Sequence, residues 1–349
     1  MNVHERMSHF NVPGVSITYF ENAKIKWSKC FGTLEKDSAK DVNKHSIFHA
    51  CSISKMVTAI CVLRLAQDSV LDLNLDVNNY LTSWKIPANE FTDKKKVTLL
   101  HLLSHQAGFY DCDGSFPPYK DSDPIPSALD ILKGITCYNQ EEVHVKYVPE
   151  TDCEYSDAGY CIIEHIFENV LGESVSQVAK RIVFDPLGLK HTFFWGIGKA
   201  LPTEIDVVDL AAGHDSKGEI VADKRAHYPN IEGAGLWTTT EELAHIVIDV
   251  IKAYQGMNSL VLNQDMAKLM LTPFGCTDDM GLGVFLATDK SNNPCFLSQG
   301  WGVGMQCKLR AYYENQNGVI VMTNSEPGME QDKALIGEII AHVCENKRI

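Results

Sequence analysis

Ser52 and Lys55 stand three positions apart, and the chain from Lys55 to Ala66 has the apolar pattern of a helix. Side chains at positions i and i+3 of a helix lie on one face, so the Lys55 ammonium can reach the Ser52 hydroxyl. A serine hydroxyl becomes a good nucleophile when a neighbouring base takes its proton, and a desolvated lysine can be that base. A helix N-terminus also directs free N–H groups at developing negative charge. A nucleophile, a base and an anion site therefore fit within one helical turn.

The same tetrad also fits a structural role. Ser52 would then be the N-cap of the helix, and Lys55 would be solvated. Ser54 is a second serine of the segment, but no lysine follows it three positions later. The choice between these interpretations depends on other segments of the chain.

Two further segments contain polar residues at the edge of a regular element. The tripeptide Tyr-Ser-Asp at 155–157 precedes an apolar helical run, which on its own fits a loop-to-helix junction with Asp157 as the N-cap. The tripeptide Ser-Gln-Gly at 298–300 lies in a glycine-rich segment, residues 296–304, which on its own fits a turn that ends a strand.

Taken in order, the three segments resemble the motifs of the serine β-lactamase and penicillin-binding-protein superfamily, which are Ser-x-x-Lys, Tyr-Ser-Asn and Lys/His-x-Gly. The sequence between these motifs resembles that of the class C and esterase branch of this superfamily. His101–Gly108 resembles its "LLSHxxG" stretch, Asp185–Thr192 its "PLGM..T" stretch and Gly233–Thr239 its "GGL.TT" stretch. The resemblance runs from about residue 12 to residue 324, which is nearly the whole chain.

The resemblance implies a role for each matching residue. Ser52 would be the acylated nucleophile, while Lys55 and Tyr155 would move its proton and protonate the leaving group. That role requires a depressed pKa for at least one of the two. The oxyanion hole would consist of the backbone N–H groups of Ser52 and Trp301. Gly300 would allow the strand to approach the substrate closely.

Two positions depart from the family pattern. Asp157 replaces the usual Asn, and Ser298 replaces the usual Lys or His, unless the register slips by one residue and Gln299 takes that position. With Gly300, we expect Asp157 and Ser298 to bind substrate. A unit charge pair at about 4 Å and an effective dielectric near 20 is worth about 4 kcal/mol. The missing cation and added carboxylate therefore predict poor binding of carboxylate substrates, although Asp157 would alternatively stabilise the Lys55 ammonium or attract a cationic substrate group.

The sequence thus predicts a β-lactamase-related serine hydrolase, esterase-like or peptidase-like, that acts on a neutral or cationic ester or amide. The alternatives are a β-lactamase or D-Ala-D-Ala carboxypeptidase or D-aminopeptidase, an acyltransferase, and a catalytically silent binding protein of the same fold. No cofactor is predicted. His101 and His105 have the i, i+4 spacing of a metal pair, but no third ligand occurs at zincin spacing, so we predict no metal site.

Composition limits the partners and the compartment. The net charge of −14 argues against nucleic acid or an anionic membrane surface, which leaves a small-molecule or peptide substrate. The N-terminus has no apolar stretch of signal-peptide length, and no segment is long enough to span a bilayer. The eleven cysteines are scattered without a Cys-x-x-Cys pair, which favours free thiols in the cytoplasm. The sequence does not indicate the oligomeric state.

Strand patterns at both ends of the chain and helical patterns between them predict an α/β (α+β) fold. We expect an antiparallel sheet flanked by helices, formed by residues 1–60 and 215–349, with an all-helical domain of residues 61–214 inserted and the site at the junction. The last helix should pack on the N-terminal hairpin, and the termini should lie side by side. The expected elements are a hairpin over 15–32, helices near 52–68, 98–103, 127–132, 159–171, 175–184, after Thr239 and over 330–344, and strands near 281–287, 306–313 and 318–323.

Overall fold

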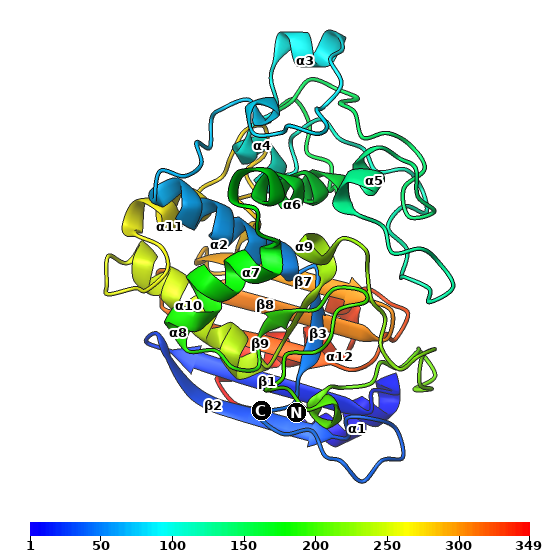
Figure 1. The fold of residues 1–349 in the computed structure, drawn as a ribbon. Helices are drawn as coiled ribbons and strands as arrows, with labels where there is room; N and C mark the ends of the chain where they lie inside the picture. The colour runs from blue at the N-terminus through cyan, green and yellow to red at the C-terminus, as the bar shows by residue number, and fades with distance from the viewer.

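The computed structural model describes all 349 residues, and an antiparallel six-stranded sheet in the order β2-β1-β9-β8-β7-β6 lies at its centre (Figure 1). Two strands come from the start of the chain and four from its end, and pairing of β1 with β9 joins the two ends. The strands are β1 (Gly14–Glu21), β2 (Lys24–Gly32), β6 (Phe285–Thr288), β7 (Pro294–Gly302), β8 (Met305–Tyr312) and β9 (Asn317–Thr323).

One expected strand boundary differs from the structure. The strand predicted over 281–287 begins only at Phe285, because the chain bends at Gly283, whose φ is +75° and whose Cβ would lie 2.4 Å from the Ala59 Cβ. The glycine-rich segment 296–304 is a strand that ends in a turn, as expected: β7 pairs with β8 as far as Gly302, and Gly304 in the turn has a φ of +76°.

Helices cover both faces of the sheet. The N-terminal helix α1 (Val3–Phe10) and the C-terminal helix α12 (Leu335–Asn346) pack on one face in a separate apolar cluster with β1 and β9. Helix α10 (Thr240–Tyr254) packs against β1, β2 and β9. Figure 1 shows the two chain ends side by side, and the Met1 amino group lies 3.4 Å from His342 Nε2, as the expected arrangement of the termini requires.

Helix α2 (Ser54–Gln67) lies among the remaining helices (Figure 1), and residues all around it are buried. A helix that is apolar on every side must be covered on every side. The largest apolar cluster joins α2 both to the sheet and to the helical segments, so the division into residues 1–60 with 215–349 and residues 61–214 stays a prediction. The other helices are α3 (Glu90–Lys94), α4 (Leu99–Leu103), α5 (Ala128–Leu132), α6 (Ala158–Leu171), α7 (Val175–Ala179), α8 (Asp185–Leu187), α9 (Ile231–Ala234) and α11 (Gln264–Met270), with a π-helical turn at Lys180–Phe184 and 3₁₀ turns at Val77–Asn79, Val207–Asp209 and Gln331–Lys333.

A second, three-stranded sheet leads the chain into the α2 helix. Its order is β3 (Phe48–Cys51), β5 (Leu236–Thr238) and β4 (Phe193–Phe194), and β3 ends one residue before Ser52. All eleven cysteines are free, whereas the cytoplasmic location stays a prediction. None of the helices combines the length and the hydropathy that crossing a membrane requires.

Candidate active site

Ser52 lies in the tight turn between β3 and α2. The preceding residue, Cys51, has a φ of +48°, a left-handed conformation that is uncommon for a residue with a side chain. The helix begins at Ser54, two residues later than the sequence predicted, because the chain must first leave this turn. The Lys55 N–H donates to the Ser52 carbonyl at 3.1 Å, so the predicted one-turn spacing of Ser52 and Lys55 is present.

Ser54, the other serine of the turn, has a structural role. Its side chain is fully buried. Its hydroxyl donates to the Cys51 carbonyl at 2.5 Å and accepts the Leu236 N–H at 2.9 Å, which links the turn to β5. Both hydrogen-bonding directions of Ser54 are therefore used inside the protein, while Ser52 lines an open cleft.

Lys55 is buried and ion-paired. Its Nζ donates to Asp157 Oδ1 at 2.6 Å and to the Gly233 carbonyl at 3.0 Å, and it lies 4.9 Å from the centre of the Tyr155 ring. Burial alone would lower the pKa of Lys55, but the charges of Asp157 and, next, Tyr155 outweigh it and raise that pKa. Lys55 is therefore an ammonium ion at neutral pH.

Tyr155 is a neutral phenol in the same arrangement. Tyr155 is 43% exposed at the cleft, yet partial desolvation still raises its pKa, while the Lys55 ammonium and the Ser52 hydroxyl act in the opposite direction without reversing the shift. Its ring stacks on His105 with 4.3 Å between ring centres. The pKa of neither Lys55 nor Tyr155 is therefore depressed as expected, because Asp157 holds the proton on the lysine and desolvation outweighs the effect of Lys55 on the tyrosine.

Asp157 faces Lys55, and it does not cap α6. Its Oδ1 accepts hydrogen bonds from Lys55 and from Asn230 Nδ2, the latter at 2.8 Å. The N–H groups at the start of α6 are instead bound by Asp111, whose Oδ2 accepts from the Asp157 N–H at 2.5 Å and whose Oδ1 accepts from the Ser156 hydroxyl at 2.9 Å. Asp157 is thus free to pair with Lys55 because another carboxylate caps the helix.

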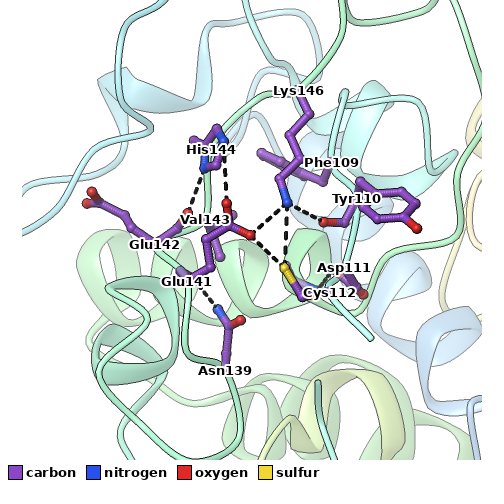
Figure 2. A pocket seen from close by; sticks show the side chains of 11 residues that line it. Phe109, Tyr110, Asp111, Cys112, Asn139, Glu141, Glu142, Val143, His144 and Lys146 are labelled. Carbon is purple, nitrogen blue, oxygen red and sulfur yellow. Dashed lines mark hydrogen bonds and ion pairs between the residues drawn. The ribbon is translucent and has the colours of Figure 1, made fainter. Parts of the chain in front are cut away.

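The loop that carries Asp111 is itself anchored. Figure 2 shows the Lys146 ammonium between the Glu141 carboxylate, at 2.9 Å, and the Tyr110 carbonyl, at 3.1 Å. The Cys112 thiol donates to the same Glu141 carboxylate at 2.6 Å. These contacts fix the two residues on either side of Asp111, so they hold its carboxylate against the Tyr-Ser-Asp segment.

Beside Ser52 is a cleft of about 420 Å³, and strand β7 forms one of its walls. Successive residues of a strand point to opposite sides, and here Gln299 and Trp301 face the cleft while Ser298 is buried. Among the predicted substrate-binding residues, Asp157, Ser298 and Gly300 are therefore absent from the cleft lining. The lining consists of Ser52, Tyr155, Phe285, Gln299, Trp301, Glu330, Gln331 and Asp332.

Gly300 is needed for a reason that differs from the predicted one. A Cβ at this position would lie 2.1 Å from the Ala50 carbonyl oxygen, so the glycine allows β7 to pass against β3 directly before Ser52. Its own carbonyl accepts Gln331 Nε2 at 2.7 Å. The close approach is thus between two protein strands, and it positions the following residue, Trp301, beside the Ser52 turn.

His101 and His105 make separate contacts. His101 Nδ1 accepts the Thr98 N–H at 3.1 Å, and its Nε2 lies 3.1 Å from Glu150 Oε2. His105 is buried, which together with Lys55 lowers its pKa to about 3, and its Nδ1 accepts the Ser156 N–H at 3.2 Å. No group of three His, Cys, Asp or Glu residues in the protein is arranged to hold a metal ion.

Several residues of the site were not among those predicted from the sequence. Gly233 is the first residue of the stretch that resembles "GGL.TT", and Asn230 lies three residues before it. The resemblance marked this stretch but did not predict its contacts with Lys55 and Asp157. A Cβ on Gly233 would lie 3.0 Å from Asp157 Oδ1 and 3.2 Å from Lys55 Nζ, so a side chain here would crowd the ion pair. Asp111 and Gln331 lie in segments with no distinctive local pattern, and only the folded chain brings them to the site.

The chain is similar to known proteins in sequence and in fold. The profile of the Beta-lactamase family matches residues 2–342. A protein of Salmonella gallinarum named "Putative D-alanyl-D-alanine carboxypeptidase" is 25% identical over 269 residues, which are 74% of this chain and 59% of that protein. The chain therefore spans less than two thirds of the length of this curated relative.

Two solved structures have the same fold. The octameric penicillin-binding protein homologue from Pyrococcus abyssi has a TM-score of 0.75 at 20% identity, covering 97% of this chain and 75% of that one. The penicillin-binding protein from Bacillus halodurans has a TM-score of 0.72 at 18% identity, covering 98% and 99%. The antiparallel sheet flanked by helices is thus the β-lactamase and penicillin-binding-protein fold, as the resemblance implied.

Proposed function

Because the chain belongs to the Beta-lactamase family, we propose that it is a serine hydrolase that forms an acyl-enzyme on Ser52. The observation that carries the proposal is the placement of Lys55. Its ammonium is bound by Asp157 and the Gly233 carbonyl and lies over the Tyr155 ring, while Ser52 and Tyr155 line one cleft. If Lys55 served only to stabilise the fold, it would not require a tyrosine and a serine that both line a cleft beside it.

We propose that Tyr155 relays the proton. As Ser52 Oγ attacks the substrate carbonyl, its proton passes to the Tyr155 oxygen, while the Tyr155 proton passes to the departing nitrogen or oxygen. Charge on the phenol oxygen is favoured by the Lys55 ammonium, which acts to lower the pKa of Tyr155. Water then attacks the acyl carbonyl by the same relay in reverse, and Ser52 regains its proton.

The oxyanion of the tetrahedral intermediate is assigned to the backbone N–H groups of Ser52 and Trp301. Gly300 brings β7 against β3, and the Gln331 amide holds the Gly300 carbonyl. In a trans peptide the C=O and the following N–H point in opposite directions, so this contact also sets the direction of the Trp301 N–H. Loss of one oxyanion donor typically costs about 3–4 kcal/mol of transition-state stabilisation.

The cleft favours neutral or cationic substrates. Its lining includes Glu330 and Asp332 and no lysine, arginine or histidine. Lys308, which lies next to Asp332, is buried and bound to it at 2.6 Å, and Glu330 is bound to Lys333 at 2.7 Å. A substrate carboxylate would therefore meet carboxylates already bound by the available cations, whereas an ester, an amide or an ammonium group would not be repelled.

Hydrolysis of D-Ala-D-Ala peptides is the second candidate, since the curated relative carries a carboxypeptidase name. It would require Asp332 to release Lys308 so that the lysine binds the terminal carboxylate. A panel of p-nitrophenyl esters, aminoacyl anilides, a chromogenic cephalosporin and D-Ala-D-Ala peptides separates the two. Turnover confined to the D-Ala-D-Ala peptides would replace the first proposal with the second.

A fluorophosphonate probe tests the nucleophile itself. We expect one adduct, located by mass spectrometry on the peptide that contains Ser52, and no adduct in Ser52→Ala. Ser54→Ala is the matched control and should still be labelled if it folds. An adduct on Ser54 or on a cysteine, or no labelling at all, would contradict the assignment and favour a binding protein of the same fold.

A further inference from the structure

A second and larger cavity, of about 820 Å³, lies apart from the Ser52 cleft and shares none of its lining residues. It is bordered by α6, α7, α9 and the chain around β4. Its walls include the apolar side chains of Phe184, Leu189, Phe193, Phe194, Ile197 and Ile231. Cavities that bind small molecules typically have volumes of roughly 300–1,000 Å³, so this one has the usual size, and its apolar side chains form one part of a lining that is otherwise polar.

Two carboxyl groups are buried in this wall. Glu164 of α6 and Glu232 of α9 are 5% and 2% exposed, respectively. Glu164 Oε2 accepts the Val175 N–H at 2.7 Å, whereas buried Glu232 Oε1 has no N–H or O–H partner, and the Cys161 thiol is the one donor near that carboxyl group. Burial raises the pKa of Glu232 to about 7, and burial together with the Glu232 charge raises the pKa of Glu164. An unpartnered buried carboxyl oxygen is costly, and it is rarely retained without a ligand or a function.

Basic and acidic side chains lie at different depths in this cavity. Lys180, Lys190 and Lys199 also border it, but their side chains are exposed, and Lys180 is bound to Asp185 at 2.7 Å. The buried part of the lining therefore has carboxyl groups and no basic side chain, while Lys55 lies behind the lining and acts to lower the pKa of Glu232. A metal ion is a poor fit, because no third ligand joins the two glutamates. A ligand with one positive group and an apolar body matches both the buried carboxyl groups and the apolar side chains of this cavity.

We propose that this cavity binds a small organic amine, with its ammonium group against Glu232 and Glu164 and its apolar body among the phenylalanine side chains. Phe184 and Phe194 stack with 6.2 Å between ring centres, which suits an aromatic body. The ammonium supplies the hydrogen-bond donor that Glu232 Oε1 lacks.

The site is connected to Ser52 through the short helix α9. Thr58 of α2 donates to the Glu232 carbonyl at 2.7 Å, and Lys55 donates to the neighbouring Gly233 carbonyl at 3.0 Å. An amine that binds the Glu232 side chain and shifts it also shifts the α9 backbone, whose Gly233 carbonyl group accepts the hydrogen bond from Lys55. A change in turnover on binding depends on the proposed hydrolase function, whereas binding itself does not.

Isothermal titration calorimetry with 2-phenylethylamine tests the site, with 2-phenylethanol as the neutral analogue of the same shape. We expect the alcohol to bind about tenfold more weakly or worse, and Glu232→Gln to lose a similar factor for the amine. Glu204→Gln, at an exposed position of the same cavity, is the matched control and should bind normally. The variant Glu330→Gln with Asp332→Asn removes the carboxylates of the Ser52 cleft and should also bind normally.

Equal binding of the amine and the alcohol, unchanged amine binding in Glu232→Gln, or no amine binding by the wild type would each overturn the proposal. Loss of binding in the Glu330→Gln, Asp332→Asn variant would move the amine to the Ser52 cleft and likewise overturn it. Glu232→Gln is expected to fold, since it removes a buried ionisable group. Should it not fold, Ala128→Phe decides instead, because a larger side chain in the wall reduces the space for the amine and leaves both glutamates in place.

Discussion

The two walls of the Ser52 cleft are built on different principles. The helical wall, where Tyr155 lines the cleft and Lys55 and Asp157 lie behind it, is held by an ion pair. The strand wall, where Gln299 and Trp301 of β7 line the cleft and Gly300 lies between them, carries no charge and is held by close backbone packing on β3. The comparison shows that electrostatics holds the side chains of the helical wall in place, whereas steric fit of the backbone holds the strand wall.

The helical wall is expected to respond most strongly to loss of its cation. Lys55→Met should lower kcat by about 10²–10⁴, the usual range for general acid–base groups, since it removes the charge that favours proton transfer by Tyr155. It should also lower the free energy of unfolding by about 3 kcal/mol or more, because Asp157 loses its partner. Turnover of a p-nitrophenyl ester and urea denaturation measure the two effects.

Lys308→Met is the matched control, because Lys308 is also buried and also bound to an aspartate at 2.6 Å. It should destabilise the protein less, since Asp332 is largely exposed, and should change kcat by less than about threefold. Equal losses of kcat in the two variants would mean that Lys55 acts only through stability.

The strand wall should fail by steric clash. Gly300→Ala places a Cβ 2.1 Å from the Ala50 carbonyl oxygen, so β7 must shift. We expect a loss of about 1–3 kcal/mol of unfolding free energy and a fall in kcat at unchanged protonation behaviour. Gly159→Ala in α6 is the control, because no atom lies nearer than 3.7 Å to its Cβ, and it should be neutral or stabilising. A fully stable and active Gly300→Ala would refute the packing account.

The variant Asp157→Asn distinguishes two roles for Lys55: an ammonium ion that assists Tyr155, or a neutral amine that acts as the base. Asp157 raises the pKa of Lys55 against the effect of burial, so the asparagine variant should have a lower Lys55 pKa. If the ammonium is the active form, activity in the variant should fall as pH rises, and this fall should occur at a lower pH than in the wild type. The pH dependence of kcat measures this shift. A gain of activity at neutral pH would instead identify neutral Lys55 as the base.

The smallest expected effect concerns specificity at the strand wall. Gln299→Lys adds a cation to the cleft lining, so the acylation rate with a chromogenic cephalosporin should rise by about tenfold and fall again with added salt. Ser298→Lys, the change that the motif alignment suggested, buries the charge and should destabilise the protein instead. A higher acylation rate in Ser298→Lys but not in Gln299→Lys would show that the strand turns its other side to substrate.

The sequence by itself determined the family, the order of the elements at both ends of the chain and the candidates Ser52, Lys55 and Tyr155. These follow from local patterns, such as the i, i+3 spacing and strand alternation. Such patterns can be recognised in the sequence without knowing which residues pack against them. The sequence also allowed an ion pair between Asp157 and Lys55 as one of two alternatives, but it did not choose between them.

Only the tertiary structure decided which groups face one another. Asp111 caps α6 from a distant loop, which frees Asp157 for Lys55, and this contact keeps the lysine protonated. Pairing with β8 turns Gln299, and not Ser298, toward the cleft. Protonation states and strand orientation depend on burial and on partners remote in sequence, so no local pattern of residues fixes them.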